Sequence, residues 1–212
     1  MLTLRCNTLK MRTMRFLPEL FENNRQWAAR QLADDASYFG RLARIQRPDY
    51  LWIGCSDSRV PANTIVGLAP GEVFVQRNVS NIVHADDDNC MSVIQYAVDV
   101  LRVSHVIVCG HYHCGGVQAA MGPTLTEPLE SWLSPIRCLC RDHAQTLSGI
   151  VSDDERWDRL CEINVRAQVS TLSGLPIIRA AWARGQSLTV HGWIYDIKDG
   201  LLRDLDVCTS TA

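Results

Sequence analysis

The stretch Trp52-Ile53-Gly54-Cys55-Ser56-Asp57-Ser58-Arg59 carries more information about the fold than any other part of the chain. The apolar residues that precede Gly54 are typical of a short buried β-strand. Cys55, Asp57 and Arg59 then follow on alternate residues, and alternate side chains of an extended segment share one face. We therefore expect a thiol, a carboxylate and a guanidinium to meet at the carboxyl end of a strand, where α/β sheets usually bind ligands.

A second strand-like segment, at 106–110, also ends in a glycine that is followed by metal-ligating residue types. His111 and Cys114 are three positions apart, close enough to bind one ion from a single turn. With Cys55 they make a Cys₂His set, and Asp57 would be a fourth ligand that can leave. This combination is typical of a catalytic zinc site, because structural zinc sites stay closed. The simpler alternative is two unrelated buried cysteines and a surface histidine, and it is disfavoured once the two motifs are counted together.

The order of the remaining segments predicts an α/β fold, in which helices flank a central, mostly parallel β-sheet. The N-terminal part is expected to form an amphipathic helical arm. Strands are expected at 50–53, 73–75, 106–110 and 188–194, with a turn at 199–200 that leads into 201–205. Helices are expected at 16–46, 63–68, 89–102, 114–121, 129–147, 153–173 and 176–184.

The length of 212 residues indicates one domain, which we place at 16–212. Residues 1–15 contain four basic side chains and no acidic one, and we expect them to be a disordered extension. A transit peptide has this kind of composition. An upstream start codon, with Met11 or Met14 as the true first residue, is the simpler explanation and the one that we favour.

The composition is that of an ordinary globular protein, with 47% hydrophobic and 21% charged residues. The net charge of −2 gives no reason to expect binding to nucleic acid or to an anionic membrane. No apolar run approaches the length of a membrane span. The nine cysteines are an odd number, which argues against a disulfide framework and for a reducing, cytoplasmic location.

Taken together, the motifs resemble those of the β-class carbonic anhydrases. The resemblance rests on the segments 55–59, 109–111 and 114–116, on Gly71-Glu72-Val73-Phe74-Val75-Gln76-Arg77-Asn78, and on His191-Gly192-Trp193. It extends over roughly residues 16 to 206.

The resemblance implies one Zn²⁺ per chain, held by Cys55, His111 and Cys114, with Asp57 as the exchangeable ligand. It implies reversible hydration of carbon dioxide to bicarbonate and a proton through zinc-bound hydroxide. Asp57 and Arg59 are then the catalytic pair, in which Asp57 moves between the zinc and the guanidinium.

Further residues are assigned from the same resemblance. The substrate pocket would comprise Gln46, Phe74, Val79 and Tyr96, and a regulatory bicarbonate site would comprise Trp52, Arg77 and Tyr195. The latter set is that of the bicarbonate-regulated, closed-site subgroup, in which the aspartate occupies zinc at lower pH. The family also assembles into homodimers and homotetramers, so self-association is expected.

Two other classes of function remain open on the sequence alone. One is a hydrolase of carbonyl sulfide or carbon disulfide on the same fold, which would share the zinc residues and differ in its pocket. The other is a non-enzymatic zinc or redox-sensing protein that uses the many thiols. The pair formed by Asp57 and Arg59 argues against a sensor, because a structural zinc site has no use for a displaceable ligand.

Overall fold

The computed structural model describes residues 16–210, so the predicted extension at 1–15 lies outside the described residues. The chain separates into two compact units, one that ends at Ile45 and one that begins at Gln46. The single domain at 16–212 stays a prediction.

The first unit is a helical arm made of α1 (Pro18–Asp34) and α2 (Tyr38–Leu42). The helical stretch predicted over 16–46 is two helices, because the chain turns between them. Asp35 accounts for the break, since its carboxylate accepts hydrogen bonds from the backbone N–H and the hydroxyl of Ser37, at 2.9 and 2.8 Å. Such local side-chain bonds compete with the helical hydrogen bonds of the backbone.

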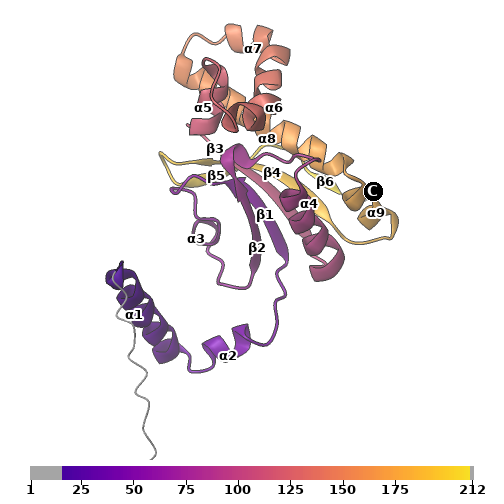
Figure 1. Ribbon diagram of the computed structural model, residues 1–212. Coiled ribbons are helices and arrows are strands. Elements are labelled where there is room, and N and C mark those ends of the chain that lie inside the picture. The colour runs from indigo at the N-terminus through magenta and orange to yellow at the C-terminus, as the bar shows by residue number, and fades with distance from the viewer. Residues whose placement is uncertain (1–15, 211–212) are drawn as a thin grey trace, which may run out of the picture. The chain divides into compact units, whose positions relative to one another are not determined.

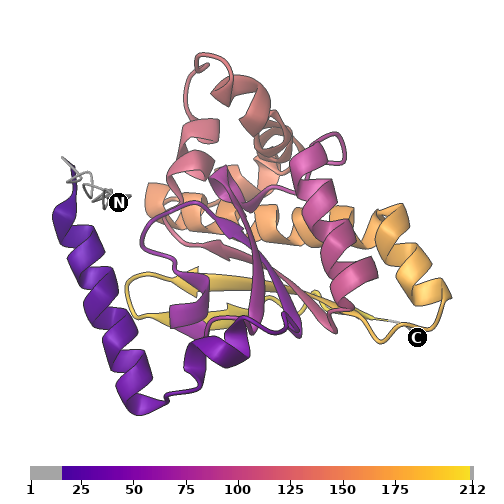
Figure 2. The ribbon, with the colours of Figure 1, turned by 60° about the horizontal axis from the view of Figure 1, so that its bottom comes forward.

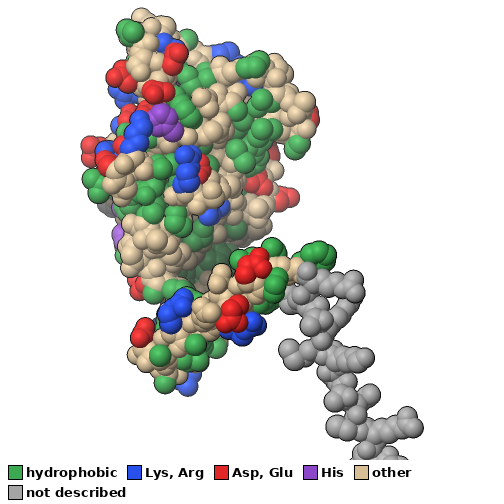
Figure 3. Space-filling model, turned by 90° about the vertical axis from the view of Figure 1, so that its left-hand side faces the viewer, with side chains coloured by type: hydrophobic (Ala, Val, Ile, Leu, Met, Phe, Trp, Pro, Cys, Tyr) green, Lys and Arg blue, Asp and Glu red, His purple; other side chains and the backbone are tan. Residues whose placement is uncertain are grey.

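The arm leaves much apolar surface exposed. Neither of its helices contains a buried residue. Phe16, Leu20 and Phe21 are among the exposed side chains, and Figure 3 shows apolar atoms beside charged ones along the arm. Trp27 and Phe39 pack edge to face, with ring centroids 5.6 Å apart, which gives the arm a small apolar contact of its own.

The second unit is built on a six-stranded sheet, which confirms the predicted α/β fold class (Figure 1). Four strands are parallel, in the order β2 (Val73–Asn78), β1 (Tyr50–Cys55), β3 (His105–His111) and β4 (Thr189–Asp196). Two antiparallel strands, β5 (Leu201–Asp204) and β6 (Thr209–Ser210), pair with β4.

The strand order puts a topological switch between β1 and β3. From β1 the chain first adds β2 on one side, and it then adds β3 on the other side. Both β2 and β3 run parallel to β1, so β1 and β3 end at the same edge of the sheet, with Gly54 opposite Cys109. Ligands of open α/β sheets bind in the crevice at such a switch point.

The helices cover the two faces of the sheet unequally. The larger core lies on the face that carries Leu51, Val106 and Val190, against α4 (Asp88–Gln95), α8 (Asp153–Gly174) and α9 (Pro176–Ala183). Figures 1 and 2 show these helices along that face. The other face carries Trp52 and Ile107, and α3 (Ala62–Val66) packs there in a smaller cluster.

The other helices of this unit are short or interrupted. They comprise η1 (Val79–Asn81), the π-helical η2 (Tyr96–Leu101) that continues α4, α5 (Gly115–Met121), α6 (Leu129–Asp142) and α7 (Ala144–Ser148). The helix predicted at 129–147 is therefore two helices that meet at His143. Within residues 16–210, no helix has the length and apolar character needed to cross a membrane.

Candidate metal centre

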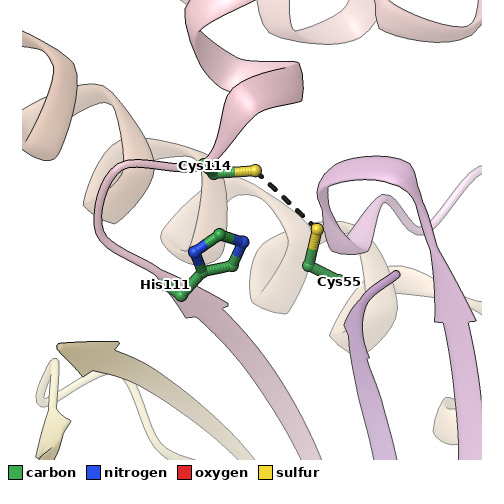
Figure 4. Close-up of side chains that lie close together, drawn as sticks. All are labelled: Cys55, His111 and Cys114. Atoms are coloured by element: carbon green, nitrogen blue, oxygen red, sulfur yellow. Dashed lines mark hydrogen bonds between the residues drawn. The ribbon is translucent and has the colours of Figure 1, made fainter. Parts of the chain in front are cut away.

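Two sulfur atoms and one imidazole meet where β1 and β3 end. Cys55 is the last residue of β1, His111 is the last residue of β3, and Cys114 directly precedes α5. All three side chains are buried, and one ligand atom from each lies within 4.8 Å of the other two. Figure 4 shows the three side chains converging from these elements. The structure thus brings together the Cys₂His set that the sequence predicts.

The hydrogen bonds of His111 leave one of its nitrogens free for a metal. Its Nδ1 lies 2.9 Å from the carbonyl oxygen of Tyr112, so this nitrogen carries the proton and donates it. Its Nε2 is buried and has no hydrogen-bond partner among the described residues. An unpartnered buried nitrogen is costly, and a metal would satisfy it. The donor set therefore fits a zinc ion.

The two thiols are strongly coupled to each other. Their sulfur atoms are 3.8 Å apart. The hydrogen bond from the Cys114 thiol is the main reason why the pKa of Cys55 falls to about 4. The same contact, together with burial, raises the pKa of Cys114 above its usual range. A zinc ion would replace the shared proton and hold both sulfurs as thiolates.

Asp57 lies beside the cluster, and in this structure its carboxylate is bound to Arg59. The guanidinium donates from Nε to Oδ1 at 2.9 Å and from Nη2 to Oδ2 at 2.7 Å. Asp57 Oδ2 is 3.7 Å from His111 Nε2, so the carboxylate borders the space that the ligand atoms enclose. The bonds from Arg59 hold the pKa of Asp57 well below its usual range. Whether Asp57 exchanges between arginine and metal stays a prediction.

The prediction that Asp57 and Arg59 continue the extended strand is wrong. The strand β1 ends at Cys55, and the next residues turn. The backbone N–H of Arg59 donates to Asp57 Oδ1 at 3.0 Å, which is the local bond of an Asx turn. The two side chains meet through this turn rather than through strand alternation.

Helix α8 supports the turn that carries Cys114. Trp157 Nε1 donates to the carbonyl oxygen of Cys114 at 2.9 Å. Asp158 accepts a hydrogen bond of 3.1 Å from the backbone N–H of His113. His113 has a φ of 53°, a left-handed conformation that reverses the chain between the two ligands of this turn. The ring of His113 is partly buried, because it packs against Trp157 with centroids 4.6 Å apart.

Sequence reasoning did not find these supporting residues. Nothing in the spacing of Trp157 and Asp158 relates them to a ligand turn that lies far away in the sequence. Asn164 offered one signal, because it is polar and yet lies on the otherwise apolar side of α8, where it is buried. A buried polar side chain needs hydrogen-bond partners, so the position of Asn164 indicates a polar network within the core.

The residues predicted to line the substrate pocket do not all meet in this structure. The rings of Phe74 and Tyr96 contact each other, with centroids 5.8 Å apart. Val79 lies against the turn that follows Cys114, because a Cβ at Gly116 would be 2.8 Å from Val79 Cγ1. Gln46 is exposed, and no hydrogen bond of its side chain occurs among residues 16–210.

Two of the three predicted bicarbonate residues, Trp52 and Tyr195, pack in one cluster, and the third, Arg77, bonds the backbone of the first ligand motif. Trp52 is 1% exposed, and its indole Nε1 has no described hydrogen-bond partner. Tyr195 packs in the same cluster as Trp52. Arg77 donates from Nε to the carbonyl oxygen of Cys55 at 2.9 Å and from Nη2 to that of Asp57 at 2.5 Å. The guanidinium thus holds the backbone on both sides of the first ligand motif.

Known proteins resemble this chain over most of its length. The family model for carbonic anhydrase matches residues 50–202. A carbonic anhydrase of Emericella nidulans is 48% identical over 89% of this chain and 83% of its own length.

Solved structures agree with this match. A Coccomyxa β-carbonic anhydrase in complex with acetazolamide has a TM-score of 0.87 and 45% identity, over 91% of this chain and 87% of that one. One of two tetrameric β-carbonic anhydrases from Sordaria macrospora has a TM-score of 0.87 and 40% identity, over 90% of this chain and 97% of that one.

The family model covers more than half of the chain, and these relatives exceed 30% identity over most of it. Their shared fold agrees with the sheet and with the buried Cys₂His cluster at its switch point. The predicted family and enzyme class are thereby confirmed: the chain belongs to the β-class carbonic anhydrases.

Proposed function

We propose that this chain hydrates carbon dioxide reversibly with one Zn²⁺ held by Cys55, His111 and Cys114. The observation that carries the proposal is the unpartnered Nε2 of buried His111, which lies between two coupled thiols at a sheet switch point. Zinc, when bound, supplies the Lewis acidity that turns water into a nucleophile at neutral pH. The protein residues then have to hold the metal, admit a small uncharged gas and accept a proton.

Asp57 supplies the hydrogen-bond acceptor next to the metal. Its carboxylate is 14% exposed and stays ionised because Arg59 donates two hydrogen bonds to it. An ionised carboxylate in this position can orient the nucleophilic water by accepting its hydrogen bond. Arg59 thereby acts through Asp57, and it also keeps Asp57 away from the metal.

We further propose that Asp57 is a switch that closes the site at lower pH. Only 3.7 Å separates its Oδ2 from His111 Nε2, so a small movement would bring a carboxylate oxygen to the metal. The Arg59 side chain is 54% exposed, so solvent screening weakens its ion pair with Asp57, and the pair can break and form again. The arginine-bound arrangement of this structure corresponds to the open, active form in this proposal.

Bicarbonate would favour the closed form from a site formed by Trp52, Arg77 and Tyr195. The buried indole N–H of Trp52 lacks an acceptor, which an oxyanion would supply. Arg77 bonds the backbone carbonyls of Cys55 and Asp57, so an anion that draws Arg77 away would loosen the first ligand motif. The allosteric effect requires that the anion bind the two arrangements with different affinity.

The substrate would enter along the apolar side chains of Phe74, Val79 and Tyr96, with Gln46 as the polar contact. Tyr96 is 45% exposed and Val79 is 39% exposed in this chain. The exposed apolar surface of the arm suggests that a second subunit covers part of it. We propose that the chain forms a homodimer or a homotetramer.

We also propose a cytoplasmic, reducing environment. The eight described cysteines, Cys55, Cys90, Cys109, Cys114, Cys138, Cys140, Cys161 and Cys208, are all free. Two thiolate ligands and exposed thiols such as Cys138 would be open to oxidation elsewhere. Localisation of the tagged full chain in its native cell tests this assignment.

The proposal is tested by measuring the zinc content of the purified protein and its turnover of three substrates. We expect one zinc per chain and hydration of carbon dioxide, with little turnover of carbonyl sulfide or carbon disulfide. Cys55→Ser should lose zinc and activity together, whereas Cys138→Ser, at an exposed cysteine of α6, should lose neither. Faster turnover of carbonyl sulfide or carbon disulfide than of carbon dioxide would instead indicate the hydrolase function. One zinc per chain with no turnover, and loss of the metal on mild oxidation, would indicate a sensor.

A further inference from the structure

We propose that Ser80 tunes the metal centre by donating a hydrogen bond from its hydroxyl to the sulfur of Cys114. This inference rests on the proposed zinc site. Ser80 is fully buried in η1, between β2 and α4. Its hydroxyl oxygen lies 3.6 Å from the sulfur of Cys114.

The direction of the hydroxyl bond follows from the chemistry of the ligand. A cysteine that binds zinc is a thiolate and has no proton to donate. The hydroxyl of Ser80 has no other hydrogen-bond partner in the described part of the chain. It therefore has to donate its proton to the sulfur of Cys114. Such a bond withdraws charge from the sulfur, so that the sulfur donates less to the metal and the metal becomes the stronger Lewis acid.

The backbone of Ser80 has an unusual conformation at the point where its hydroxyl reaches the sulfur of Cys114. Ser80 has φ 68° and ψ 25°, a left-handed conformation that non-glycine residues rarely adopt. The side chain is also confined, because a Cβ at Gly116 would lie 2.1 Å from its hydroxyl oxygen. The glycine at the second position of α5 thus leaves the room that the hydroxyl needs.

A buried polar network on α8 maintains this conformation. Asn164 Nδ2 donates to the carbonyl oxygen of Ser80 at 2.9 Å. Gln168 Nε2 donates to Asn164 Oδ1 at 2.9 Å, and Gln168 Oε1 accepts from the backbone N–H of Val83 at 2.9 Å. Asn164 is 1% exposed and Gln168 is 3% exposed. These bonds fix the loop at both Ser80 and Val83, so Ser80 is a positioned donor rather than a residue that merely fills space.

The test compares the cobalt-substituted wild type with Ser80→Gly and Ser80→Ala. Glycine adopts a φ of 68° without strain, so Ser80→Gly removes the hydroxyl while the turn is preserved. Ser80→Ala removes the same hydroxyl without adding flexibility. The control is Ser148→Ala on α7, where an exposed hydroxyl donates only to the carbonyl oxygen of Gln145. Near-UV circular dichroism checks that every variant is folded.

We expect the thiolate-to-cobalt charge-transfer band to move to longer wavelength in both Ser80 variants, because a thiolate without its hydrogen bond gives up an electron more readily. The midpoint of the pH profile of carbon dioxide hydration should move to higher pH in both. Ser148→Ala should change neither. A wild type with no thiolate band would overturn the zinc site itself. A band that is present in the wild type but unmoved in both Ser80 variants, or that moves only in Ser80→Gly, would overturn the role of the hydroxyl.

Discussion

Replacing Arg59 with methionine is the most informative perturbation of the proposed switch. Methionine has a similar length and no hydrogen-bond donor. It would remove the bonds from Nε to Asp57 Oδ1 at 2.9 Å and from Nη2 to Asp57 Oδ2 at 2.7 Å. The backbone N–H of Arg59 still donates to Oδ1, so the local turn is retained. The open arrangement alone loses stability, because only this arrangement contains the pair.

The expected magnitude follows from the exposure of the pair. A hydrogen bond to a charged group contributes about 1.5 to 3 kcal/mol when buried. The Arg59 side chain is 54% exposed, so solvent screening reduces the combined free-energy contribution of the two bonds to about 1 to 2 kcal/mol. A loss of about 1.4 kcal/mol changes the ratio of open to closed protein about tenfold. If opening releases one proton, the pH at half-maximal activity rises by about one unit.

Stopped-flow hydration of carbon dioxide measures this shift directly. The profile of Arg59→Met should lie at higher pH than that of the wild type and approach the wild-type rate at the alkaline end. Arg166→Met, at an exposed arginine of α8, is the matched control and should leave the profile unchanged. A profile of Arg59→Met with the wild-type midpoint and a uniformly lower rate would refute the switch and leave Arg59 only the role of positioning Asp57.

Three further predictions concern the polar network, the bicarbonate site and the metal. Asn164→Leu leaves the Ser80 carbonyl and a buried glutamine amide without partners, so the free energy of unfolding should fall by about 2 to 6 kcal/mol in urea titrations; a loss below about 1 kcal/mol would contradict the network. Gly54→Ala places a Cβ 2.3 Å from Trp52 Nε1 and should abolish inhibition by bicarbonate while hydration at alkaline pH persists; unchanged inhibition would argue against that site. Removal of zinc by a chelator should lower the melting temperature, since His111 Nε2 then lies buried without a partner, and added zinc should restore it; a melting temperature that does not respond to either treatment would contradict a zinc ion at this position.

The sequence was sufficient to predict the sheet and the convergence of Cys55, His111 and Cys114, for a local reason. Each ligand motif directly follows a strand of apolar residues, and the parallel pairing of those strands brings the motifs to one edge. Side chains next to a strand end are positioned by the strand itself. Cys55 and His111 could therefore be located without knowledge of the rest of the fold.

The residues that support the ligands could not be predicted in the same way. Ser80, Trp157 and Asn164 reach the centre through tertiary packing between η1, the second ligand turn and α8. Their spacing from the ligand residues along the sequence is irregular, so no sequence pattern relates them to the site. The break at Asp35 interrupts the helical stretch expected over 16–46, because an aspartate that bonds Ser37 overrides the helical periodicity around it.

The central claim is that the buried Cys₂His cluster binds a zinc ion that hydrates carbon dioxide. The most direct test is stopped-flow hydration by the zinc-quantified protein between about pH 6.5 and 9, beside Cys55→Ala. The account predicts fast hydration that rises steeply toward alkaline pH in the wild type, with loss of both zinc and activity in the variant. Absence of hydration at every pH in protein that contains one zinc per chain would contradict it.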